Sequence, residues 1–317
     1  MTHPFTGAGV ALITPFIENK SIDYNALERL IEDQIQGGID YLVVLGTTGE
    51  TPALSDHEKK EIVRFVIEKN AGRLKIVVGM GGNDTLGLVK AIQNASFDGV
   101  DAILSVTPYY SKPTQEGLFQ HYKAVVETSP VPVILYNVPG RTGVNMEAET
   151  TIRIANLSKN VVAIKEACGV LGQFTKIIHE APDYFKVISG DDGLTLPSIA
   201  IGSIGVISVI ANALPDKLSK LTRTSLEGDL SAANQLHLQM AEMLKLIFKE
   251  NSPAGVKALM EMMGKSKNQL RLPLVPVTVP TWNAIEAEWK KFLSALTILT
   301  LKIFILKGSM SDPKTAV

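Results

Sequence analysis

Short apolar runs alternate along the chain with longer segments of helical periodicity. The short runs are four or five residues long and rich in β-branched side chains, which predicts buried strands at residues 9–13, 41–45, 75–78, 102–106, 133–136, 161–165, 186–189 and 205–209. In the longer segments apolar residues recur every three or four positions, which predicts helices at residues 24–36, 56–69, 85–95 and 115–126. Eight such units within about 230 residues favour an α/β fold of the (β/α)₈ TIM barrel type over an open doubly wound sheet, because that barrel takes about 250 residues.

The chain continues past the eighth unit with helical patterns at residues 232–248, 253–263 and 282–306, which predict a C-terminal helical addition. A proline-rich stretch at residues 272–277 is expected to be extended, because proline removes a donor and disfavours helix in the preceding residue. We therefore expect a barrel with the active site at residues 1–225, a helical region at 226–306 and a disordered tail at 307–317. The apolar run at residues 296–306 is too short for a membrane anchor and contains Lys302, and the sequence gives it no role.

Charge and cysteine content limit the partners and the compartment. The 317 residues carry a formal net charge of -1, and the charges are evenly spread, so neither a nucleic acid nor an anionic membrane is an expected partner. Cys168 is the single cysteine, which excludes an internal disulfide framework and fits a reducing compartment. The first residues carry no basic region and no apolar signal core, so we expect a cytoplasmic protein. The predicted substrate is a small molecule.

Polar residues gather at the carboxyl ends of the predicted strands, where the active site of a (β/α)₈ barrel lies. The runs after strands two to seven are Gly46-Thr47-Thr48-Gly49-Glu50, Gly79-Met80-Gly81-Gly82-Asn83, Thr107-Pro108-Tyr109-Tyr110, Tyr136-Asn137-Val138-Pro139-Gly140-Arg141-Thr142, Lys165-Glu166 and Ser189-Gly190-Asp191-Asp192. Lys165 is unusual, since it closes the apolar run Val161-Val162-Ala163-Ile164 and lysine is seldom buried. Its amine either reaches water beside an apolar stem or takes part in chemistry.

The strand ends also limit the available chemistry. They carry no histidine and no carboxylates spaced like metal ligands, so no metal site is predicted. If the run 161–164 supplies an apolar wall that lowers its pKa, Lys165 can form a Schiff base with a carbonyl substrate. Tyr136 is the leading candidate for the proton transfers, and Thr47 and Tyr110 could extend it into a hydroxyl relay.

Two further residues indicate a carboxylate substrate. Arg141 offers a planar fork for a carboxylate, and the glycine turn at Gly190 lets backbone N–H groups approach a second one. Each residue also has a structural interpretation: Arg141 could form a surface ion pair, Tyr136 could be a rim residue, and Asp191-Asp192 could cap the following helix. As a set they describe an α-keto acid aldolase.

These motifs resemble the dihydrodipicolinate synthase family of pyruvate-dependent class I aldolases, which also includes N-acetylneuraminate lyase. The resemblance covers about residues 5 to 295 and is most specific in the runs 46–50, 107–110, 136–142 and 164–167. It implies a Schiff base between Lys165 and pyruvate and no further cofactor. The enamine would attack L-aspartate 4-semialdehyde, and the adduct would cyclise to 4-hydroxytetrahydrodipicolinate in the diaminopimelate route to lysine.

The resemblance also implies roles for individual residues and an assembly. By position it assigns a proton relay to Tyr136, Thr47 and Tyr110, the semialdehyde carboxylate to Arg141, and pyruvate contacts to Thr48 and Ile207. Members are usually homotetramers built from two tight dimers, and the residue that matches Tyr110 crosses into the partner's site. The isolated subunit would then be a poor enzyme.

One departure and two alternatives accompany this interpretation. Lysine-inhibited members carry histidines and a glutamate where this chain has Asp56, Lys59 and Gly87, and the lost glutamate and added positive charge predict weak or absent lysine feedback. A sialic acid or keto-sugar acid lyase is the alternative enzyme, although its substrate needs neither the Arg141 anchor nor the threonine relay. A non-catalytic, ligand-binding barrel is the second alternative, although a pure binder has no use for a reactive amine.

Overall fold

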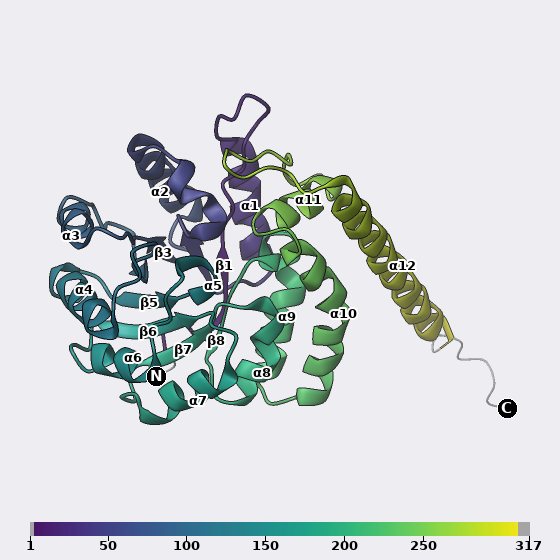
Figure 1. Cartoon of the computed structure of the whole chain (residues 1–317). Coiled ribbons are helices and arrows are strands. Elements are labelled where there is room, and N and C mark those ends of the chain that lie inside the picture. The colour runs from purple at the N-terminus through teal and green to yellow at the C-terminus, as the bar shows by residue number, and fades with distance from the viewer. Residues whose placement is uncertain (1–2, 310–317) are drawn as a thin grey trace.

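The computed structural model describes residues 3–309, with side chains for residues 3–294. Eight parallel strands pair in chain order and close into a barrel, with helices around it (Figure 1). The strands are β1 (Gly7–Ala11), β2 (Tyr41–Val44), β3 (Lys75–Gly79), β4 (Ala102–Val106), β5 (Val133–Asn137), β6 (Val161–Glu166), β7 (Lys186–Ser189) and β8 (Gly205–Ser208). The predicted (β/α)₈ TIM barrel is confirmed, and each strand end lies within two residues of its expected position.

The helices follow the strands and then continue past the barrel. They are α1 (Tyr24–Gln36), α2 (Asp56–Asn70), α3 (Thr85–Gln93), α4 (Gln115–Thr128), α5 (Pro139–Thr142), α6 (Ala148–Ala155), α7 (Leu171–Glu180), α8 (Thr195–Ala200), α9 (Pro215–Leu226), α10 (Leu230–Phe248), α11 (Ala254–Met262) and α12 (Val279–Ser309). Short 3₁₀ turns follow some strands: η1 (Thr47–Gly49), η2 (Thr51–Ala53), η3 (Asp192–Leu194) and η4 (Ile210–Asn212). Polar caps mark several helix starts, as where the side chains of Ser55 and Glu58 bond each other's backbone N–H groups in front of α2.

Side chains of one strand divide between two apolar layers, because successive residues point to opposite faces of a sheet. The inner layer fills the barrel and includes Val43, Leu104, Ile134, Ile188 and Ile207. The outer layer packs strand residues against the surrounding helices. A residue's parity along its strand therefore decides whether it faces the barrel interior or a helix.

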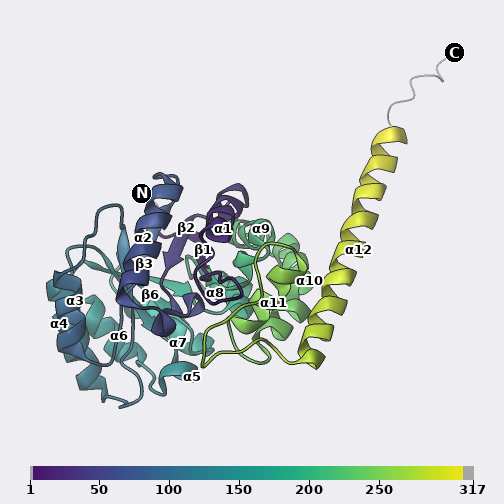
Figure 2. The same ribbon diagram turned by 90° about the horizontal axis from the view of Figure 1, so that it is seen from above.

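The C-terminal helices pack against the barrel. Met240, Ile247, Leu259 and Ile285, from α10, α11 and α12, share one apolar core with strand residues such as Val10. Figure 2 shows α12 extending outward past α10 and α11. The proline-rich stretch is neither helix nor strand, and its Leu272 and Val275 are exposed, as expected for an extended surface segment.

Two expectations concern the end of the chain. The apolar run 296–306 lies in α12 beyond the described side chains, and most of the expected tail, residues 310–317, lies outside the described part of the chain. Among the helical residues that are described, no stretch is long and apolar enough to cross a bilayer.

Candidate active site

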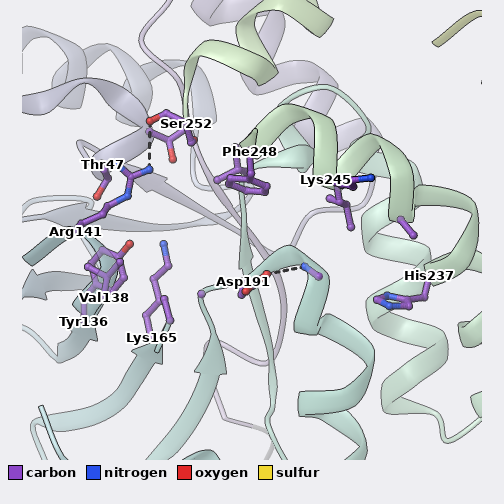
Figure 3. Close-up of a pocket in the computed structure, with 17 residues that line it drawn as sticks. Thr47, Tyr136, Val138, Arg141, Lys165, Asp191, His237, Lys245, Phe248 and Ser252 are labelled. Carbon is purple, nitrogen blue, oxygen red and sulfur yellow. Dashed lines mark hydrogen bonds between the residues drawn. The ribbon is translucent and has the colours of Figure 1, made fainter. Parts of the chain in front are cut away.

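A pocket of about 580 Å³ opens at the carboxyl ends of the strands (Figure 3). Residues from strand ends, from the segments that follow them, from α10 and from the loop after α10 line it: Thr47, Thr48, Tyr136, Val138, Arg141, Lys165, Ala167, Gly190, Asp191, Gly193, Val209, His237, Ala241, Leu244, Lys245, Phe248 and Ser252. Six of the eight residues predicted for the site are among them: Lys165, Tyr136, Thr47, Thr48, Arg141 and Gly190. Tyr110 and Ile207 are not.

Lys165 is buried near the end of β6, and its side chain points into the pocket (Figure 3). Its Nζ lies 4.4 Å from the centroid of the Tyr136 ring on β5, because the β5–β6 register places these two residues opposite each other. Lys165 and Tyr136 therefore lie against each other in the lining of the pocket.

The apolar surroundings of Lys165 differ from the expected wall. Val161 and Ile164 lie in the outer layer, whereas Ala163, two residues before Lys165, lies in the inner one. The physical reason is twofold: alternation along the strand sends Ile164 to the face opposite Ala163, and the register shift between Val161 and Ala163 leaves Val161 on the same outer face as Ile164. The apolar floor comes instead from several strands, through residues such as Ile134 and Ile188.

Thr47 and Thr48 are held by a tight turn after β2. The backbone N–H of Gly49 donates to the Gly46 carbonyl at 3.1 Å, and the Thr14 hydroxyl donates to the Gly49 carbonyl at 2.7 Å. Glu50 ends the turn in the left-handed region with φ 54°, which costs energy for a residue other than glycine. Its buried carboxylate pairs with the ammonium of Lys257, and this ion pair joins the turn to α11.

Gly190 and the two aspartates after it form the pocket edge beside Lys165. A Cβ on Gly190 would lie 2.8 Å from the Ala167 Cβ and 3.0 Å from the Lys165 Cε, so the lysine stem needs a glycine here. Asp191 caps η3 by accepting from the Gly193 backbone N–H at 2.8 Å, as the capping interpretation predicted. Asp192 does not cap the helix. Its buried carboxylate accepts hydrogen bonds from the Ser208 hydroxyl and the Val209 backbone N–H, and burial raises the pKa of Asp192 to about 6.

Arg141 lies on α5 and lines the pocket, with its guanidinium directed toward Ser252 (Figure 3). One guanidinium nitrogen, Nη2, donates to the Ser252 carbonyl at 3.3 Å. The side chain is exposed, so it could bind the carboxylate of a substrate that enters from solvent.

Comparisons with known proteins identify the family of the chain. Residues 4–291 match the Dihydrodipicolinate synthetase family. The chain belongs to this family. It is 52% identical over 279 residues to the 4-hydroxy-tetrahydrodipicolinate synthase of Parabacteroides distasonis, covering 88% of this chain and 94% of that one.

Solved structures of the dihydrodipicolinate synthetase family have the same fold. Dihydrodipicolinate synthase from Thermotoga maritima superposes with a TM-score of 0.89 at 40% identity, over 92% of this chain and 99% of that one. The enzyme from Cyanidioschyzon merolae, solved with lysine bound, gives 0.88 at 34% identity, over 92% and 99% of the two chains.

Two predicted residues of this family member lie outside the pocket. Tyr110 is 88% exposed on the loop after β4 and has a left-handed backbone with φ 69°, so the expected convergence of all hydroxyls on one mouth does not include it. Ile207 is fully buried in the inner layer of the barrel. Position at a strand end predicts the edge of the barrel but not the direction of a side chain in the loop beyond it.

The sequence interpretation missed the contribution of α10, which brings an imidazole to the pocket. His237, Ala241, Leu244, Lys245 and Phe248 recur with helical spacing and line the side facing away from Lys165. Desolvation lowers the pKa of His237, and its Nδ1 is buried with no hydrogen-bond partner. Their helical spacing in the sequence was the available signal, but the rule that places a barrel's active site at the strand ends does not extend to a helix beyond the eighth strand. Within the described residues, no group of three His, Cys, Asp or Glu side chains could hold a metal ion.

Proposed function

We propose that this protein is a 4-hydroxy-tetrahydrodipicolinate synthase, a lyase of lysine and diaminopimelate biosynthesis that condenses pyruvate with L-aspartate 4-semialdehyde. The observation that carries the proposal is the buried amine of Lys165 beside Tyr136 in a pocket that Arg141 also lines. Family membership and the curated relatives support it, since those relatives bear this enzyme's name over most of the chain.

The reaction would begin at Lys165, whose neutral amine adds to the carbonyl carbon of pyruvate. Loss of water gives an imine, which draws electrons from the methyl carbon, and loss of a methyl proton gives an enamine. The enamine carbon then attacks the aldehyde of the second substrate, and the new alkoxide takes a proton. The substrate amine finally displaces Lys165 as the ring closes, which returns the free enzyme.

The pocket residues would bind the substrates and move these protons. Tyr136 would serve as the main proton carrier, since its ring centroid lies 4.4 Å from the Lys165 amine, and Thr47 lines the same pocket. Thr48 and the backbone at Gly190 would hold the pyruvate carboxylate, and Arg141 would hold the carboxylate of the semialdehyde. We assign no cofactor beyond the covalent pyruvate.

We also propose a homotetramer built from two tight dimers, in which Tyr110 completes the relay of the partner's site. Its 88% exposure and its position outside the pocket of its own chain support this role. Mixing the inactive variants Tyr110→Phe and Lys165→Ala tests it, because a mixed dimer contains one site with both native residues. About a quarter of the sites should regain activity after random exchange. No recovery after verified exchange would show that Tyr110 acts otherwise.

Borohydride trapping with pyruvate tests the central step. An adduct should form on Lys165 of the wild type and be absent from Lys165→Ala, which should also lose turnover of the semialdehyde. Synthase activity that survived in the variant would contradict the mechanism. Turnover of N-acetylneuraminate instead of the semialdehyde would favour the alternative aldolase, and pyruvate binding without an adduct would favour a non-catalytic barrel.

A further inference from the structure

Asn137 and Glu166 lie directly behind the Tyr136–Lys165 pair. In the β5–β6 register Tyr136 is opposite Lys165, and the next residues, Asn137 and Glu166, are opposite each other. Because successive side chains point to opposite faces, the first pair faces the pocket and the second faces the helices. Both Asn137 and Glu166 are fully buried.

The Glu166 carboxylate joins several elements through neutral donors. The Asn137 Nδ2 donates to its two oxygens at 2.9 and 3.1 Å, the Gln173 Nε2 of α7 donates at 2.9 Å, and the Cys168 backbone N–H donates at 2.9 Å. Asn137 in turn accepts from the Met146 backbone N–H at 2.9 Å. Among the residues with described side chains, no cation pairs with Glu166; burying such a carboxylate is costly, and burial raises the pKa of Glu166.

The pairing of β5 and β6 has a feature that makes such a link useful. Val133 is opposite Val161 but Ile134 is opposite Ala163, so the register shifts by one residue before the site. A shift of one residue exchanges the two faces of a strand, and a bulge twists the strand that carries it. The Asn137–Glu166 hydrogen bonds act at the far end of the same strand pair, where the shifted register places Tyr136 opposite Lys165.

We propose that Glu166 is a positioning residue, which uses Asn137 to hold the ends of β5 and β6 so that the Lys165 amine and Tyr136 stay in contact. The inference rests on the proposed Schiff-base function. It predicts that loss of the Glu166–Asn137 link slows imine formation and turnover more than it weakens pyruvate binding, because small misplacements of reacting groups are costly in rate.

The test compares three variants at a temperature where circular dichroism shows each to be folded. Glu166→Gln replaces the carboxylate by an amide, whose NH₂ group would face the N–H donors that now bind Glu166. It should lower kcat, and the rate at which the borohydride-trapped pyruvate adduct forms, about 10- to 100-fold, and should change the pyruvate KM by no more than about 3-fold. Gln173→Leu is the matched control, since it removes a partner of the same carboxylate on α7 but keeps the β5–β6 link, and it should leave kcat within about 2-fold. Asn137→Asp combined with Glu166→Gln reverses the hydrogen bond and should recover at least about 5-fold in kcat.

The outcomes separate the alternatives. A wild-type rate in Glu166→Gln, or an equal loss in Gln173→Leu, would overturn the inference, and the second result would indicate general loosening. If Glu166→Gln does not fold, Glu166→Asp decides, because it keeps the charge but withdraws the carboxylate from Asn137, and an unchanged kcat would overturn the inference. A wild type that forms no adduct would refute the proposed function instead, independently of these comparisons.

Discussion

Replacing Lys257 by methionine should destabilise the protein strongly. Its ammonium is completely buried and donates to the Glu50 carboxylate, to the Thr14 carbonyl at 2.8 Å and to the Gln269 carbonyl at 2.8 Å. It also lies 4.4 Å from the centroid of the Phe16 ring. Methionine fills a similar volume, so the loss is that of the charge and its hydrogen bonds rather than of packing.

The expected loss in the free energy of unfolding follows from the carboxylate that the substitution leaves unpaired. Burial lowers the pKa of Lys257 to about 8, so at pH 7 the amine is charged and pairs with Glu50. Lys257→Met leaves that carboxylate buried with a hydrogen bond from the Arg271 backbone N–H at 2.9 Å. Removing one partner of a buried ion pair costs about 3–5 kcal/mol. Each 1.4 kcal/mol is tenfold, so the folding equilibrium constant should fall at least about 100-fold.

Urea denaturation at pH 7 and fixed protein concentration measures this loss. The midpoint should fall with an unchanged m-value. The double variant Glu50→Gln/Lys257→Met contains no unpaired charge and should recover about 2 kcal/mol or more relative to Lys257→Met. A loss below about 1 kcal/mol in the single variant, or strictly additive effects in the double variant, would refute the account of this pair.

Three further predictions concern activity, pH and regulation. Gly190→Ala brings a Cβ to 3.0 Å from the Lys165 Cε, and this crowding should lower kcat about 10- to 100-fold in steady-state kinetics. An unchanged kcat would show that the lysine side chain tolerates the added methyl group. The Arg271 guanidinium lowers the pKa of Glu58 to about 2, so the stability from this pair should be present above pH 4.5 and be lost as the pH falls toward 2. Denaturation midpoints over this range should fall less steeply in Arg271→Gln, and parallel curves would contradict the assignment. Low concentrations of L-lysine should leave activity unchanged because of the positive charge at Lys59 and the lost glutamate, and inhibition in that assay would contradict this.

The barrel could be predicted from the sequence because a parallel strand covered on both faces is a continuous apolar run. All eight runs became strands, and the rule that active sites lie at their carboxyl ends led to Lys165, Tyr136 and Thr47. The same continuity hid the alternation within each run. Val161 and Ile164 look equivalent to Ala163 in the sequence, but they face the helices, so the wall around Lys165 could not be assigned by adjacency.

Features that depend on tertiary packing could not be predicted from the sequence. The orientation of Tyr110 depends on a left-handed backbone in a loop, and His237 enters the pocket from a helix after the eighth strand. Lys257 belongs to an apolar helical pattern, and only its distance to Glu50, 207 residues away in the sequence, explains its burial. No local pattern contains such a pairing.

Three buried carboxylates beside the pocket show how this barrel separates chemistry from support. Glu166 follows Lys165, Asp192 follows Asp191, and Glu50 ends the threonine turn, so adjacency alone would suggest catalytic acids. Each instead turns away from the pocket and is satisfied by amide or hydroxyl donors or by Lys257. A carboxylate beside a lysine favours the charged amine, whereas the proposed mechanism needs the neutral amine. Because Glu166 lies on the opposite face of β6, the acid that directly follows Lys165 in the sequence links the ends of β5 and β6 instead of entering the pocket.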